Sequence, residues 1–146
     1  MAAFNSDFKL AHTLNGGVAR TESSDDGGKL RYMVSTYTVT ATAHAIADTI
    51  NFGTLPKGAR VLGNLSKLYW ATGAASSTLA IGDVTTAGKF LAATAVTTAG
   101  GAIMEAANAS GALFKTAAET DIIGTIAGAA LQTGQVITAH IVYVQD

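Results

Sequence analysis

Alternation of apolar and polar positions begins at Arg31 and predicts a first β-strand. The segment RYMVSTYTVTATA, residues 31–43, divides into two sides. One side carries Tyr32, Val34, Thr36, Thr38 and Thr40, and the other carries Met33, Ser35, Tyr37, Val39 and Ala41. Period-two patterning with β-branched and aromatic residues is typical of a strand.

Two further strands are expected before residue 71. One runs from Asp48 to Leu55, with Ile50 and Phe52 on the same side, and Pro56 ends it because proline cannot donate to a β-ladder. The next covers residues 59–70, ARVLGNLSKLYW, and the glycine at position 63 predicts a kink or bulge within it.

The second half of the chain continues the pattern of strands and turns. Short strands are expected at STLAIGD (77–83) and, more weakly, at KFLAAT (89–94). ETDIIGTIAGAAL (119–131) and QVITAHIVYV (135–144) give two more, and the last is the most regular. Within 96–116, a short Ala-rich helix around Ile103 to Asn108 and a wide loop are both compatible with the sequence.

Six or more strands at spacings of roughly 10 to 20 residues, without a long amphipathic helix, predict an all-β fold. An antiparallel β-sandwich, or a jelly-roll-like single domain, fits this pattern best. We expect the domain to cover residues 31–146 and to follow an N-terminal arm and linker, residues 1–30, which lacks the period-two pattern. The arm carries four apolar residues that must fold back on the body or dock onto another chain, and these are the candidate partner-binding residues Phe4, Phe8, Leu10 and Leu14.

The composition of the chain limits the classes of function that it can have. Of 146 residues, 49% are apolar and only 13% are charged, about half of the roughly 25% in typical soluble domains. Ala, Thr, Gly and Ser fill the deficit, and such a lightly charged surface suits permanent assembly with other protein chains. The net charge of −1, with scattered Lys and Arg, argues against a nucleic-acid partner.

Membrane and secretory functions are not expected either. No window approaches eighteen uninterrupted apolar residues, and the N-terminus has no basic segment followed by an apolar one. The chain has no cysteine, which excludes disulfides, thiolate nucleophiles and cysteine zinc sites.

Catalytic chemistry is not apparent in the sequence. His12, His44 and His140 lie in different segments without metal-ligand spacing, and no GxSxG, P-loop or GxGxxG motif occurs. Asp83 and Asp121 stand at strand ends, where capping a turn is favoured over binding a cation. We therefore expect no enzyme activity, no metal and no organic cofactor.

Residues 48–144 contain a series of strand and turn segments that resembles a known family. These segments are DTINFGTLPKGARV, SSTLAIGD, KFLAATA, TDIIGTIAGA and GQVITAHIVYV. Together they resemble head decoration (cement) proteins of tailed bacteriophages. The resemblance implies a sandwich or jelly-roll body that assembles as trimers or similar oligomers on the capsid exterior, binds the major capsid protein and stabilises the shell. Such a protein is made in the cytoplasm of the bacterial host.

Two other functions remain compatible with the sequence. A phage tail or host-adhesion component would share the all-β fold and low charge. A glycan-binding module would use exposed aromatic residues such as Tyr69 and Trp70, although one of these is more simply a core residue. Fold alone does not separate these functions. The arm lies outside the resemblance, so its role as a capsid anchor is inferred from its own residues.

Overall fold

A computed structural model of the chain describes residues 29–40, 44–105 and 114–145. The candidate partner-binding residues Phe4, Phe8, Leu10 and Leu14 lie outside these ranges. Within them the chain forms nine strands and one short 3-10 turn. The elements are β1 (Lys29–Thr38), β2 (Thr49–Leu55), β3 (Ala59–Val61), η1 (Gly63–Leu65), β4 (Lys67–Trp70), β5 (Thr78–Gly82), β6 (Leu91–Ala95), β7 (Gly100–Ile103), β8 (Thr120–Ala127) and β9 (Val136–Gln145).

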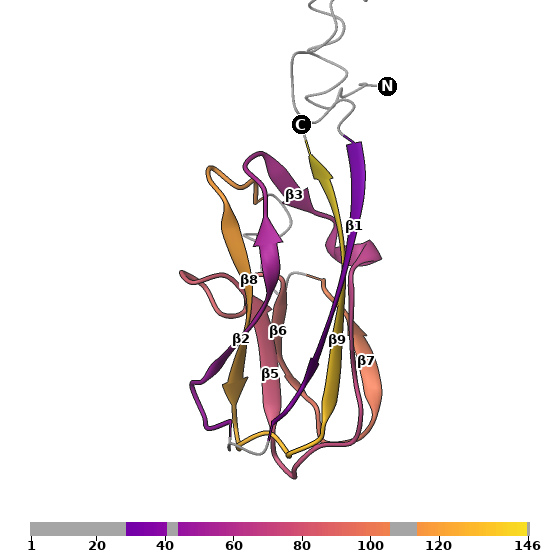
Figure 1. The fold of residues 1–146 in the computed structure, drawn as a ribbon, viewed down its shortest axis with the longest axis vertical. Helices are drawn as coiled ribbons and strands as arrows, with labels where there is room; N and C mark the ends of the chain where they lie inside the picture. Colours follow the sequence, from indigo (N-terminus) through magenta and orange to yellow (C-terminus); the bar gives the residue numbers. More distant parts are fainter. Residues whose placement is uncertain (1–28, 41–43, 106–113, 146) are drawn as a thin grey trace, which may run out of the picture.

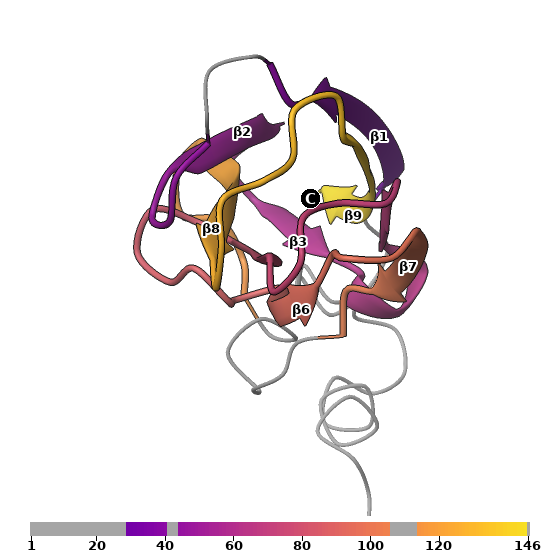
Figure 2. The ribbon, with the colours of Figure 1, turned by 90° about the horizontal axis from the view of Figure 1, so that it is seen from below.

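The strands form two antiparallel sheets that pack face to face (Figures 1 and 2). The first sheet has the order β1-β9-β4-β7, with β3 also paired to β9, and the second has the order β2-β8-β5-β6. We call them the β9 sheet and the β8 sheet. This arrangement confirms the predicted all-β antiparallel sandwich.

The order of the strands is that of a jelly roll. With β3 set aside, the first strand pairs with the last (β1 with β9), the second with the second from last (β2 with β8), then β4 with β7, and β5 with β6. The pairs are therefore nested like one long antiparallel hairpin, with β5 and β6 at its tip. Wrapping this hairpin into two layers produces the double-sheet jelly-roll architecture.

The kink expected at Gly63 is the 3-10 turn between β3 and β4. Both strands pair with β9, but five residues separate Val61 from Lys67 while only two separate their partners on β9. Ser66 holds this insertion, since its hydroxyl donates to the Leu62 carbonyl at 2.9 Å and accepts from the Val142 N–H at 2.9 Å. A side chain at Gly63 would bring Cβ to 2.1 Å from the Met104 carbonyl oxygen, so glycine is needed there.

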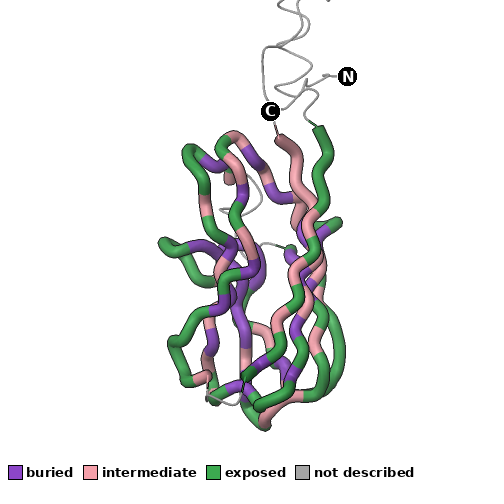
Figure 3. The backbone as a smooth tube through the Cα atoms, viewed as in Figure 1, coloured by how far each residue is buried: buried purple, intermediate pink, exposed green. Residues whose placement is uncertain are grey.

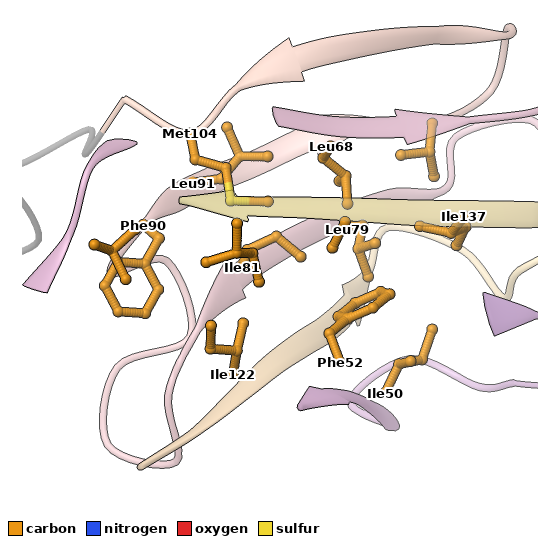
Figure 4. Close-up of a cluster of buried hydrophobic side chains, with 14 of the residues drawn as sticks. Ile50, Phe52, Leu68, Leu79, Ile81, Phe90, Leu91, Met104, Ile122 and Ile137 are labelled. Atoms are coloured by element: carbon orange, nitrogen blue, oxygen red, sulfur yellow. The ribbon is translucent and has the colours of Figure 1, made fainter. Parts of the chain in front are cut away.

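The core lies between the sheets and is filled by alternate residues of both. Figure 4 shows Ile50, Phe52 and Ile122 from the β8 sheet facing Leu68 and Ile137 from the β9 sheet. Ile137, Ala139 and Ile141, on one side of β9, are fully buried. In contrast, β1 is exposed or half-buried along its whole length (Figure 3).

Two expected elements differ in the structure. The first strand ends at Thr38 rather than at residue 43, because the partner chain turns away there: the Val39 N–H still donates to the Gln135 carbonyl at 2.9 Å, but the Gln135 N–H donates to the Gln132 carbonyl in the preceding turn. Residues 41–43 lie outside the described ranges. Between residues 96 and 116, a short helix or a wide loop was expected, but the structure has strand β7 there, which ends at Ile103. The remainder of the expected helix, residues 106–108, also lies outside the described ranges.

Candidate interaction surface

The outward side of the β9 sheet carries most of the exposed large apolar side chains. Cross-strand register places Leu30 opposite Val144, Tyr32 opposite Val142, and Val34 opposite His140. The same register continues through Lys67 to Ile103 on β7. We call this surface the outer face, and its main side chains are Leu30, Tyr32, Val34, Thr36, Lys67, Tyr69, Ile103, Val136, Thr138, His140, Val142 and Val144.

Exposure on the outer face is unusually high for apolar residues. Within the described ranges, nine large hydrophobic residues are exposed, and six of them lie here: Leu30, Tyr32, Val34, Tyr69, Ile103 and Val136. Their exposed fractions run from 39% to 64%. A contiguous exposed apolar patch on a soluble protein marks an interaction site more often than chance exposure does.

His140 lies in the middle of the outer face, between two tyrosines. Its Nδ1 is hydrogen-bonded to the Tyr32 hydroxyl at 2.6 Å, and its ring meets the Tyr69 ring edge-on with centroids 5.1 Å apart. The Lys67 ammonium lies 4.8 Å from the centre of the Tyr69 ring. The sequence showed only that this histidine lacks metal-ligand spacing, and it gave no indication that the four side chains lie together.

The outward side of the β8 sheet has a different chemistry. It presents small polar residues, among them Thr49, Asn51, Thr54 and Asp121. The Thr54 hydroxyl donates to the Asp121 carboxylate at 2.6 Å, so two neighbouring strands satisfy each other's polar groups there. The outward side of the β8 sheet, where Ile123 is the large apolar residue of β8, is thus more polar than the outer face.

Asp83 caps a turn, as its position at the end of a strand suggested. Its Oδ1 accepts from the Thr85 N–H at 2.9 Å, the Thr85 hydroxyl at 2.6 Å and the Thr86 N–H at 2.8 Å. Its Oδ2 forms a buried ion pair with Lys89. Burial raises the pKa of the Asp83 carboxyl, but the hydrogen bonds from Lys89, Thr85 and Thr86 together outweigh burial and hold that pKa below its usual range.

The remaining candidates for chemistry are occupied by structural contacts. His44 is hydrogen-bonded to the Tyr37 hydroxyl, and His12 lies outside the described residues. In the described part of the chain, no three His, Cys, Asp or Glu residues cluster as a metal site would require. No helix there is long and apolar enough to cross a membrane.

The adjacent aromatic residues of β4 point to opposite sides of the sheet. Trp70 packs against the core, and its indole N–H donates to the Thr98 carbonyl at 2.7 Å. Tyr69 points outward and is 42% exposed. The two rings therefore do not form one platform for a sugar.

The fold and the outer face define a class of molecule: a jelly-roll sandwich with one apolar sheet surface. Among solved structures, the chain is similar over its full length to a chain of the cyanophage Pam1 capsid asymmetric unit, with a TM-score of 0.66, 21% identity and 100% coverage of both chains. It is also similar to a chain of the capsid of Ralstonia phage GP4, with a TM-score of 0.66, 20% identity, and 89% and 93% coverage of the two chains. At these identities the likeness concerns the fold. No family model and no curated protein matches the sequence.

Proposed function

We propose that this protein is a structural component of a phage virion, namely a decoration (cement) protein that binds the outer surface of the head and stabilises the shell. The observation that carries the proposal is the fold similarity to chains of two phage capsids, which covers 100% of this chain in one comparison and 89% in the other. The low charge and the apolar outer face support it, because both favour permanent contacts with protein rather than with solvent or nucleic acid.

The proposed partners are the major capsid protein and further copies of this chain, arranged as a homotrimer. We propose neither a nucleic-acid nor a membrane partner and no catalytic activity. Three titratable side chains support the proposal that the protein has no catalytic activity, because Asp83, His44 and His140 are each held by structural hydrogen bonds. The protein would be made in the cytoplasm of the bacterial host and would end on the exterior of the capsid.

The N-terminal arm is the proposed anchor to the capsid. Its apolar residues Phe4, Phe8, Leu10 and Leu14 would gain by burial in a groove of the shell, since unburied aromatic side chains are unfavourable in water. Ordering the arm costs roughly 1–2 kcal/mol of backbone entropy per residue. Only the part that contacts the capsid is therefore expected to become fixed.

The test is co-sedimentation with purified DNA-filled heads that lack tails. We expect the full chain to sediment with these heads, and a variant lacking residues 1–20 to remain folded by circular dichroism but to bind them weakly. Quadruple substitution of Phe4, Phe8, Leu10 and Leu14 by Ser, with the chain length kept, separates loss of apolar contacts from loss of length.

Other outcomes would contradict parts of the proposal. Wild-type occupancy by the truncated chain would exclude the arm as the anchor, and failure of the truncated body to fold would assign the arm to the core. If the full chain binds isolated tails and not heads, it is a tail component. If it binds glycan arrays in the absence of virions, it is an adhesion module.

A further inference from the structure

We propose that the outer face is the surface through which copies of this chain meet, so that its occupant is a second copy of the same protein. The inference rests on the self-association contained in the proposed function and assigns a surface to it. Four observations on the described residues lead to it: the sequence of β9, the contrast between the two sheets, the distribution of charge, and the shape and size of the face.

Strand β9 has the sequence of a strand that is covered on both sides. Strands buried on both faces read as nearly continuous apolar runs, whereas strands with one wet face alternate cleanly. β9 reads VITAHIVYVQ: Ile137, Ala139 and Ile141 fill the core, while three valines lie on the other side together with Thr138 and His140. β8, at the equivalent place in the other sheet, has one large apolar residue on its outward side, Ile123, beside Asp121 and Thr125. Among the residues that the structure describes, no second layer covers the outward side of β9.

Charge favours an occupant that is itself nearly neutral. The outward side chains of β1, β9, β4 and β7 include one cation, Lys67, and no carboxylate. The Lys67 ammonium is already placed over the Tyr69 ring, and Arg60 of β3 lies on the same side, at the end of the sheet. A strongly charged partner would lose hydration on binding here without gaining opposite charges. The outer face of another copy is a surface of matching chemistry.

The outer face is also flat beside Gly101 of β7, where the ring of Tyr69 would otherwise protrude and obstruct stacking. A Cβ at Gly101 would lie 3.0 Å from Cδ1 of Tyr69 and 3.2 Å from Cε of Lys67. Because glycine has no Cβ, both side chains lie low across β7. Flat sheet faces of alternating residues stack at a separation of about 10 Å, which is the packing already present inside this sandwich.

The size of the face predicts a weak contact that becomes strong on a lattice. β1 and β9 have ten residues each, and β4 and β7 have four each. With roughly 3.3 Å per residue and about 4.8 Å between strands, the flat area is about 450 Å² per copy. Two such faces give about 900 Å², more than most crystal contacts and less than a standard stable interface. When copies of the chain are held on one shell by their arms, their raised local concentration would be enough to form such a contact.

The experiment compares matched lysine substitutions on the two sheets of the full-length protein. Val34→Lys introduces a charge in the outer face on edge strand β1, and Thr49→Lys introduces the same charge on edge strand β2 of the β8 sheet. We expect wild type and Thr49→Lys to self-associate alike in light scattering and sedimentation over a concentration series. We expect Val34→Lys to need a protein concentration about tenfold higher, or more, to reach the same degree of self-association. Ile103→Lys, on the other side of the same face, gives an independent second variant if Val34→Lys does not fold.

A labelling measurement locates the contact directly. The chain has no cysteine, so Val34→Cys and Thr49→Cys each offer one thiol to a maleimide. On assembled protein, the thiol of Val34→Cys should be protected at least severalfold relative to the dilute monomer, while that of Thr49→Cys should label equally in both. Association should change little between low and high salt, because an apolar contact is not screened.

The outcomes that overturn the inference are distinct from failure of the proposed function. A wild type that stays monomeric at every concentration and on heads, or unchanged association of both outer-face variants, would exclude a second copy as the occupant. If Val34→Lys instead abolishes binding of a monomeric protein to heads, the face docks on the shell and the inference is wrong although the decoration function stands. If no binding to heads occurs but association depends on Val34, the inference stands and the decoration function fails.

Discussion

The buried pair of Asp83 and Lys89 should stabilise the fold unequally through its two partners. Asp83 and Lys89 are only 5% and 7% exposed. If Asp83→Asn removes the anion, the Lys89 ammonium keeps only the Phe114 ring, 3.7 Å away, among its described partners. An uncompensated buried charge of this kind costs about 3–5 kcal/mol. The Asn side chain can still accept hydrogen bonds in the turn. The loss in the free energy of unfolding therefore measures the effect of removing the negative charge.

Removal of the cation should cost less. In Lys89→Met, the Asp83 carboxylate keeps three hydrogen bonds from Thr85 and Thr86, and the Met side chain still packs on the Phe114 ring. We expect a loss of about 1–3 kcal/mol. The double variant should be more stable than the sum of the two losses predicts, by about 1–3 kcal/mol, because neither charge is then left alone.

The pH dependence gives an internal check with a defined sign. The pKa of Asp83 is lowered from its ordinary value of 3.8 in the folded protein. Its contribution is therefore fully present above the unfolded-state pKa and is lost as the pH falls through the lowered folded-state value. The stability difference between wild type and Asp83→Asn should be constant from neutral pH down to about 5 and should shrink below about 4.

Urea unfolding followed by circular dichroism, with the m-value checked for two-state behaviour, measures all three variants. The reasoning is refuted if Lys89→Met costs more than Asp83→Asn, or if the double variant shows strict additivity. Additivity would mean that the two charged groups do not interact in the folded protein.

Three further predictions concern the core and metal independence. Leu79→Ala should lower the free energy of unfolding by about 2–5 kcal/mol in urea, because Leu79 is fully buried between the sheets; Val84→Ala, at an 84% exposed position, should change it little. Gly124→Ala should cost about 1–3 kcal/mol by the same assay, since its Cβ would lie 2.7 Å from Cε2 of Phe52; a neutral result would mean that Phe52 moves freely. EDTA should leave the melting temperature unchanged, and a large drop would revive a cation site at Asp83 or Asp121.

The fold was largely predictable because burial in a sandwich imposes period two on each strand. β9, β2 and β5 could be placed within a residue or two of their observed bounds, because their inward residues are aliphatic or aromatic and glycine or proline bounds them. β7 could not be predicted. Its sequence, GGAI, has two glycines with low strand propensity, and it is a strand because β4 supplies the ladder and because Gly101 makes room for the side chains of Tyr69 and Lys67.

The outer face was harder to predict than the fold because alternation does not reveal which side is inward. In β1, each side carries one tyrosine and at least one other apolar residue, so the sequence does not determine which of Tyr32 and Tyr37 faces the core. The observed pairing of β1 with β9 determines it. The nearly continuous apolar run of β9 did contain a usable indication of two-sided burial, but its meaning depends on knowing that β9 lies between β1 and β4.

The nested order of strands also determines how the arm and the outer face can be used together. β1 is antiparallel to β9, with Lys29 opposite Gln145, so the chain N-terminal to Lys29 begins at one end of the sandwich, beside the end of β9 (Figure 1). The outer face extends from that end along the strands, about 33 Å for ten residues. Copies that meet through their outer faces around an axis parallel to the strands would direct all their arms toward the same end. A pair of this kind can bind a shell with two arms at once, whereas copies packed end over end would direct half of their arms away from it.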